Sequence, residues 1–316
     1  MPGVAARRVA LRSGLQARVV ETGPPDGAPV LLFHGWACSA YSWRHQLPAL
    51  AHAGARAIAV DLKGHGLSGK PLGESEYERE SMTDFAAETV EALGLDRFAL
   101  VGHSLGGGIA TRFALEHPER VARLAVLSAV GFGRLPFIPL VRVLPAAAVE
   151  PLLPHLMPRW LYRLVLWGVT GNLRQYSERD VSEYWAATQF PEFPVVLWRL
   201  LREYSWRELD PAERERICVP LLAIYGSDDR VVWHPLRRPV MQWWRGGHDG
   251  DVRDAGVEDA AAAMADLGAE AEARIIPGAG HAAHEEAPEE VTGMLLHFLE
   301  PWLAEHASVH GRRRTV

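Results

Sequence analysis

VGHSLGG, residues 101–107, places a serine between glycines, directly after an apolar run and directly before a helix-like one. Gly102, Ser104 and Gly106 give the pattern G-x-S-x-G, which is typical of a tight strand-to-helix turn that exposes a serine hydroxyl. Glycines on both sides let the backbone turn sharply and leave room around the hydroxyl. A helix that starts there also offers backbone N–H groups and the positive end of its dipole. The stretch therefore predicts a nucleophilic serine, provided that the chain supplies the strand, the helix and a base.

Short apolar runs alternate with helical patterns along much of the 316-residue chain. Near-continuous apolar runs are typical of parallel strands that are buried on both faces. Their alternation with helices predicts an α/β fold with a mostly parallel, doubly wound central sheet. The predicted strands are Val30–Phe33, Ala57–Val60, Phe98–Val101, Leu124–Ser128, Leu221–Tyr225 and Arg274–Ile276, and the clearest predicted helices are Ser81–Leu93 and Gly107–His117.

One long segment, from about Gly131 to Arg216, interrupts this alternation. It contains prolines, several tryptophans and helical patterns, and it has no convincing strand. A segment of this length is too long to be a loop inside a compact fold. We therefore expect an inserted α-helical cap over residues 131–216, within a core domain formed by residues 1–130 and 217–316.

Composition excludes several classes of function. The formal net charge of −6 leaves no basic footprint for nucleic acid. The two cysteines, Cys38 and Cys218, lie far apart, so neither a disulfide framework nor a cysteine zinc site is supported. The N-terminus lacks the apolar core of a signal peptide, and no apolar run reaches the roughly 18 residues of a membrane span. The sequence predicts a cytoplasmic protein without stable membrane insertion.

A serine hydroxyl is a poor nucleophile without a base, so a histidine and an orienting acid should follow it in the chain. The apolar run that ends at Tyr225 is followed by Gly-Ser-Asp228-Asp229, and the last strand-like run is followed by GAGH, which ends at His281. His284 lies three residues further on. Each candidate follows the carboxyl end of a predicted strand, where open α/β sheets build their sites. On the residues alone, either aspartate and either histidine could serve.

These motifs, in this order, resemble the α/β-hydrolase family over about Val30 to Leu299. The resemblance is carried by His34-Gly35-Trp36, by the Asp61–Ser68 loop, by the serine turn, by the paired aspartates and by the late histidine. It implies Ser104 as nucleophile, His281 as general base and Asp229, three residues after a glycine, as the acid. Asp228 and His284 are the alternatives.

The resemblance also implies an oxyanion hole made of backbone N–H groups. The residue directly after the nucleophile, Leu105, would supply one of them, and Trp36 in the HGW motif would supply the other. A second place where the family can carry its acid, the end of the predicted strand Leu124–Ser128, has no carboxylate here. This absence favours Asp229.

Two patterns mimic cofactor and metal sites. GHGLSGKP, residues 64–71, fits both G-x-G-x-x-G and G-x-x-x-x-G-K. Pro71 replaces the Ser or Thr whose hydroxyl binds Mg²⁺, and no helix pattern starts there, so no nucleotide cofactor is expected. His281-x-x-His284 is not the H-E-x-x-H pattern of a zinc protease, so no metal is expected. Cys38 is interpreted as a small buried side chain rather than as a pocket residue.

The family resemblance narrows the reaction. Its haloalkane dehalogenase and epoxide hydrolase branches carry an aspartate at the turn, so a serine favours acyl transfer to water. We expect a carboxylesterase that acts on uncharged, small-molecule esters with short to medium chains. The alternatives are a carbon–carbon bond hydrolase of ring-cleavage diketones and, from another class, a non-catalytic ligand receptor on the same fold.

The chain also departs from the family pattern. The connection between Asp229 and His281 is about twenty residues longer than usual, and the extra residues lie within 236–256. We expect this segment either to pack against the cap or to contact a second subunit in a homodimer. A surface loop without a role is the alternative.

Overall fold

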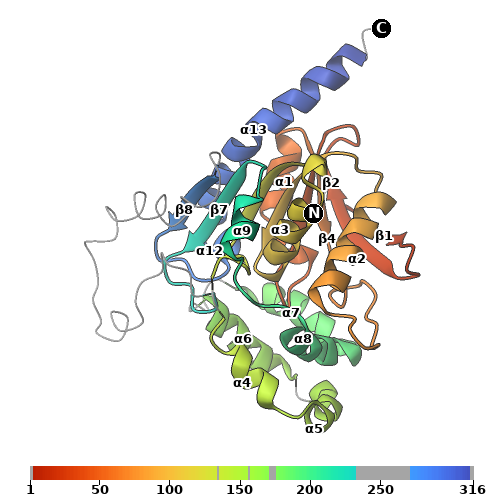
Figure 1. Ribbon diagram of the computed structural model, residues 1–316, viewed down its shortest axis with the longest axis vertical. Helices are drawn as coiled ribbons and strands as arrows, with labels where there is room; N and C mark the ends of the chain where they lie inside the picture. Colours follow the sequence, from red (N-terminus) through yellow and green to blue (C-terminus); the bar gives the residue numbers. More distant parts are fainter. Residues whose placement is uncertain (1–2, 134, 156, 171–175, 233–270, 314–316) are drawn as a thin grey trace.

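The fold is built on one eight-stranded sheet with the strand order β1-β2-β4-β3-β5-β6-β7-β8. A computed structural model describes residues 3–133, 135–155, 157–170, 176–232 and 271–313 (Figure 1). The strands from β3 and β4 to β8 pair in parallel, and the first two strands are antiparallel. Their bounds are β1 Ala5–Ala10, β2 Gln16–Thr22, β3 Ala28–Phe33, β4 Ala55–Val60, β5 Phe98–His103, β6 Val121–Leu127, β7 Leu221–Gly226 and β8 Ala271–Ile276. The mostly parallel α/β sheet predicted from the sequence is confirmed.

The strands β1 and β2 were not predicted. Residues of β1 are exposed except for Val9, and its arginines lie on the open edge of the sheet. In β2 the fully buried Ala17 and Val19 alternate with more exposed residues. A search for continuous apolar runs finds strands that are buried on both faces, so it misses an edge pair that is buried on only one. Charged side chains on an edge strand also oppose pairing with other chains.

Helices cover both faces of the sheet, as a doubly wound fold requires. Helices α2 (Arg79–Ala92) and α3 (Leu105–Glu116) pack on one face, and α1 (Gln46–His52) and α13 (Pro288–Arg313) pack on the other. Neighbouring residues of β3 point to opposite faces, because Leu31 belongs to the first core cluster and Leu32 to the second. The two cores explain why the central strands are apolar along their whole length.

Between β6 and β7 the described residues form helices and no strand. Figure 1 shows the helices between residues 138 and 203 gathered at one end of the sheet, with α13 extending from the opposite end. The helices between β6 and β7 are those of the cap that we propose for residues 131–216. Their bounds are α4 Ile138–Val143, α5 Ala146–Val149, η3 Glu150–His155, α6 Arg159–Thr170, α7 Glu178–Ala186, η5 Ala187–Gln189, α8 Glu192–Glu203 and α9 Pro211–Glu215. No helix in the described ranges is both long enough and apolar enough to cross a bilayer. Residues 236–256 lie outside the described residues.

The turn at Ser104 joins β5 to α3 through a strained serine. Its φ of 51° and ψ of −115° are rare for a residue with a Cβ atom. Such a conformation costs of the order of 1–3 kcal/mol and persists only where its surroundings enforce it. The backbone N–H of Ser104 donates to the Leu127 carbonyl (2.9 Å), and its carbonyl accepts from the N–H groups of Gly108 and Val130, both at 3.1 Å.

The glycines around this serine are needed for close packing rather than for a positive φ. A Cβ atom built on Gly102 would lie 2.5 Å from the carbonyl oxygen of Gly106. A Cβ atom on Gly106 would lie 2.5 Å from the carbonyl oxygens of Phe33 and His34. Neither glycine has a positive φ. The glycines therefore bring α3 against the end of β3, and the serine itself carries the strain.

The first prediction concerns this close approach. Gly106→Ala should lower the free energy of unfolding by about 3 kcal/mol, because its methyl group meets backbone atoms that cannot rotate away. Gly293→Ala in α13 is the matched control, since its Cβ atom meets nothing within 4 Å, and it should stabilise by about 0.5–1 kcal/mol. Urea unfolding of both variants measures the difference. Equal effects of the two substitutions would contradict the packing argument.

Candidate active site

Three buried side chains form a hydrogen-bonded row at the carboxyl ends of β5, β7 and β8. The Nε2 atom of His281 lies 2.9 Å from the Oγ atom of Ser104, and its Nδ1 atom lies 2.9 Å from Oδ2 of Asp229. Ser104 sits on the turn after β5, Asp229 follows β7, and His281 follows β8. The structure thus brings together the serine, the aspartate and the histidine that the family resemblance selects.

Asp229 is held as a carboxylate. Its Oδ1 atom accepts hydrogen bonds from the N–H groups of Val231 (2.8 Å) and Val232 (3.0 Å), while Oδ2 faces His281. Burial alone would raise the pKa of Asp229, but the charge of His281 and these hydrogen bonds outweigh burial and lower it. Asp228 is arranged differently: its Oδ1 atom accepts from the hydroxyl of Ser227.

The backbone around His281 is fixed from three sides. The carboxylate of Glu286 accepts from the N–H of Gly280 (2.9 Å) and from the N–H of Ala282 (3.1 Å). The carbonyl of His281 lies 3.0 Å from Nε2 of His103, and its N–H donates to the Val169 carbonyl of α6 at 3.3 Å. Burial raises the pKa of Glu286 to about 7, although the two N–H groups oppose this shift. Sequence reasoning missed Glu286, because nothing in its spacing indicates which backbone groups it contacts.

His284, the alternative base, belongs to the core behind the site. Its ring is fully buried and has no hydrogen-bond partner among the described residues. The ring centroid lies 4.7 Å from that of Trp43 and 4.5 Å from that of His103, with the rings tilted against each other. Burial, and then the neighbouring His103, keeps the pKa of His284 well below its usual value. Burial likewise lowers the pKa of His103 to about 3. The His284 ring therefore acts as a packing group, whereas the His103 ring also contacts the carbonyl of His281.

Two backbone N–H groups next to the serine make no hydrogen bond to the described part of the chain. Leu105 is the first residue of α3, so its N–H has no partner within the helix. The other N–H is that of Trp36. Gly35, which precedes it, is so close to the serine that a Cβ atom built there would lie 3.2 Å from the Ser104 Cβ atom. The Trp36 side chain donates to the Leu197 carbonyl of α8 (2.9 Å), which ties this loop to the proposed cap.

A cavity of about 160 Å³ opens onto Ser104 and His281. Its walls come from both the core and the helices between β6 and β7, and they are mostly apolar. Neither lysine nor arginine occurs among the described residues that line it. Besides the serine and the histidine, they include Trp36, Cys38, Leu135, Tyr162, Leu166, Val169, Tyr184, Leu201, Trp206 and Glu285.

A buried ion cluster beside this cavity joins α7 to the histidine segment. The guanidinium of Arg44 contacts Asp180 at 3.1 Å and also pairs with Glu285, and the hydroxyl of Tyr184 donates to Glu285 at 2.7 Å. Burial raises the pKa of Glu285, and Arg44 opposes this effect. Sequence reasoning also missed this cluster, whose members come from segments far apart in the chain.

The polar groups of the glycine-rich loop that resembles a nucleotide site hydrogen-bond within the protein. Asp61 accepts from the N–H groups of Ala40 (2.7 Å) and Leu67 (2.9 Å), and Lys70 donates to the carbonyls of Gly66 and Ser68. These bonds fold the loop on itself. Within the described ranges, no three His, Cys, Asp or Glu side chains gather in a group that could hold a metal ion.

Comparison with known proteins supports the α/β-hydrolase fold that the sequence motifs resemble. Residues 28–288 match the model of the alpha/beta hydrolase fold family. Epoxide hydrolase A of Mycobacterium tuberculosis is 36% identical, with 94% of this chain and 98% of that protein covered. A solved epoxide hydrolase, CorEH, superposes with a TM-score of 0.73 at 23% identity, covering 94% of this chain and 99% of that one. A 2-hydroxy-6-oxo-6-phenylhexa-2,4-dienoate hydrolase from Rhodococcus sp. strain RHA1 superposes with a TM-score of 0.69 at 21% identity, covering 94% and 99%.

The second prediction concerns Glu286. A carboxyl whose pKa rises from 4.5 to about 7 on folding stabilises the fold fully below pH 4.5, and this stability is lost as the pH rises through 7. Between pH 5 and pH 8, wild type should therefore lose about 2 kcal/mol of unfolding free energy relative to Glu286→Gln. Urea unfolding at both pH values measures this.

The control is Glu74→Gln, at an exposed loop position. This variant should follow the pH profile of wild type. A Glu286→Gln profile parallel to wild type would show that Glu286 does not titrate in this range.

Proposed function

The chain belongs to the alpha/beta hydrolase family, and from this premise we propose that it is a carboxylic ester hydrolase with Ser104 as its nucleophile. The observation that carries the proposal is the hydrogen-bonded row from Ser104 through His281 to Asp229. A hydroxyl within 2.9 Å of an imidazole nitrogen has a base to take its proton. A buried carboxylate on the other ring nitrogen holds the imidazole in the required orientation.

The proposed reaction proceeds through an acyl-enzyme. The Oγ atom of Ser104 attacks the ester carbonyl carbon while His281 takes its proton, and Asp229 stabilises the imidazolium that forms. The N–H groups of Trp36 and Leu105 bind the oxyanion, and His281 then protonates the departing alcohol. Water, deprotonated by His281, attacks the acyl carbon, and collapse of the second tetrahedral intermediate returns the proton and the electron pair to the serine oxygen.

The cavity favours a small and uncharged substrate. A volume of about 160 Å³ is small for a ligand site, and its lining is mostly apolar. A charged group buried there would lose its hydration, and the carboxylate in the described lining, that of Glu285, is already paired with Arg44. These properties support a short ester arm in this cavity.

Epoxide hydrolysis is the second candidate, because Epoxide hydrolase A of Mycobacterium tuberculosis is 36% identical over nearly its whole length. The nucleophile disfavours this reaction by the covalent route. A carboxylate that opens an epoxide forms an ester, which water can cleave at the carbonyl carbon. A serine oxygen that opens an epoxide forms an ether, which has no carbonyl for water to attack. Ser104 would stay alkylated after one reaction, so a serine at this turn supports acyl transfer.

Carbon–carbon bond hydrolysis remains an alternative within the family. The name of the similar Rhodococcus hydrolase gives a dienoate, which carries a carboxylate, as its substrate. In the present chain, Arg44 lies beside the cavity but is already paired with Asp180 and Glu285. The described lining therefore has no free cation to bind the carboxylate of such a substrate, and this favours an uncharged ester.

The third prediction tests the enzyme against the receptor alternative. Wild type should hydrolyse p-nitrophenyl acetate and its longer homologues, and Ser104→Ala should lower kcat by about 10⁴-fold or more. An epoxide such as styrene oxide and a ring-cleavage dienoate, each tested as substrate, should not be turned over. Steady-state kinetics on the three substrate types, the esters, the epoxide and the dienoate, provide the measurement.

Different failures have different meanings. Turnover of the epoxide or of the dienoate in preference to the esters would replace the proposed reaction. Folded protein with no turnover, which a serine-directed phosphonate also fails to label, would favour a non-catalytic receptor.

The fourth prediction separates the two aspartates. Asp229→Asn should lower kcat by about 10⁴-fold, because an amide no longer holds the required tautomer of His281 or stabilises its charge. Asp228→Asn is the matched control, since its side chain bonds to Ser227, and it should keep wild-type kcat within about threefold. Ester hydrolysis at pH 8 measures both. Equal losses in the two variants would contradict the role proposed for Asp229.

A further inference from the structure

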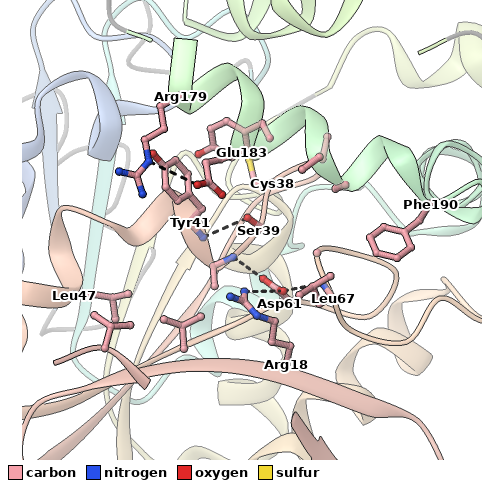
Figure 2. A pocket seen from close by; sticks show the side chains of 18 residues that line it. Arg18, Cys38, Ser39, Tyr41, Leu47, Asp61, Leu67, Arg179, Glu183 and Phe190 are labelled. Atoms are coloured by element: carbon pink, nitrogen blue, oxygen red, sulfur yellow. Dashed lines mark hydrogen bonds and ion pairs between the residues drawn. The ribbon is translucent and has the colours of Figure 1, made fainter. Parts of the chain in front are cut away.

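A second cavity, of about 330 Å³, lies between the core and the helices α7 and η5 (Figure 2). Core residues on β2, on the loop after Trp36 and on the Asp61 loop form one side, and residues 179–190 form the other. It is distinct from the cavity that opens onto Ser104, and neither Ser104 nor His281 lines it. Its volume falls within the range of small-molecule sites, whereas the catalytic cavity alone is smaller than that range.

The two cavities share part of one wall. Ala37, Cys38 and Tyr184 line both of them. The Tyr184 side chain is fixed by its hydrogen bond to Glu285, and the Ala37 carbonyl accepts from the hydroxyl of Tyr162. The Cys38 side chain is much smaller than that of Tyr184 in this shared wall. Burial raises the pKa of its thiol, so it stays neutral and behaves as a compact apolar group.

The charged groups around the second cavity already have partners. Figure 2 shows Arg18 beside Asp61 on one side and Arg179 beside Glu183 on another. The Arg18 guanidinium donates to Asp61 at 3.1 Å, and Arg179 lies 3.7 Å from Glu183. Asp61 also accepts from two backbone N–H groups, so its carboxylate is satisfied.

The rest of the lining is mostly apolar and includes Val20, Leu47, Leu67 and Phe190. Opposite charges pair around the cavity, and none is left over to attract an ion. Such a cavity suits an apolar, uncharged chain.

We propose that the second cavity is a subsite for one long apolar arm of the ester, and that this arm reaches it past the Cys38 thiol. The substrate class is then an unsymmetrical ester, with a short arm held in the catalytic cavity and a long apolar arm beyond Cys38. This inference rests on the proposed ester hydrolysis at Ser104. It adds that the two arms of the ester are held in compartments of different size.

The test uses two series of aliphatic esters in place of p-nitrophenyl esters. One series lengthens the acyl arm, and the other lengthens the alcohol arm. For each series the ratio of kcat/KM for the eight-carbon arm to that for the two-carbon arm is measured. Leu67→Trp fills the second cavity from a position that does not line the catalytic one. It should lower this ratio at least tenfold in one series and leave the other series unchanged.

Two further variants complete the design. Leu72→Trp is the matched control, since Leu72 is 44% exposed, as against 42% for Leu67, and lines neither cavity. It should keep both ratios at the wild-type value. Cys38→Ala widens the partition and should raise the ratio severalfold in the same series that Leu67→Trp lowers.

The outcomes separate the two proposals. Ser104-dependent turnover of the two-carbon ester, with ratios that neither Leu67→Trp nor Cys38→Ala changes, would overturn the subsite and leave the ester hydrolase in place. Equal loss in both series would show a general disturbance and would also overturn it. Wild type without any Ser104-dependent turnover would remove the proposed function itself, and the subsite with it.

Discussion

The positive φ of Ser104 is the constraint on which the site depends. A serine in this conformation directs its side chain away from the path of β5 and α3, to where a base can reach it. The backbone tolerates it because its N–H and carbonyl are bound by Leu127, Gly108 and Val130. The close packing of the glycines around Ser104 also brings the start of α3 beside the loop of Trp36. The strained Ser104 thus fixes the nucleophile, and the close packing of Gly35 and Gly106 brings together the two N–H groups that we propose as the oxyanion hole.

Around His281, burial and hydrogen bonding act in opposite directions on the acidic side chains. Asp229 accepts two backbone N–H groups in addition to the imidazole, and its pKa is lowered despite burial. Glu285 is also buried and Glu286 is partly buried, and their partners do not overcome the loss of hydration, so their pKa values rise. Of these three acids, Asp229, whose pKa is lowered, is the one that faces the histidine. Glu286 and the Arg44 cluster act on the backbone of the histidine segment and on its contact with α7.

The sequence allowed prediction of the parts that rest on local patterns. Strands buried on both faces are apolar throughout, and the site motifs follow three of them directly, so the sheet centre, Ser104 and the two segments with the candidate acid and base could be inferred. The choice of Asp229 over Asp228 and of His281 over His284 rested on the family resemblance. The edge strands β1 and β2 could not, because one-sided burial leaves only a weak alternation. Arg44 and Glu285 are 241 residues apart in sequence, and only the folded chain brings them together. Cys38 was expected to be a buried packing residue, whereas it lines two cavities.

Sequence similarity along the whole chain points to one reaction, and the nucleophilic side chain, a serine hydroxyl, points to another. An identity of 36% to an epoxide hydrolase over nearly the whole chain shows a shared family, and it does not by itself give the reaction. Whether water can cleave the covalent intermediate, by contrast, depends on the nucleophile and on the group that it attacks. An oxygen of a carboxylate gives an intermediate with a carbonyl whatever it attacks, whereas a hydroxyl oxygen gives one only if the substrate supplies it. With Ser104 in place, the carbonyl must come from the substrate, and a neutral ester supplies both this carbonyl and an alcohol that can leave.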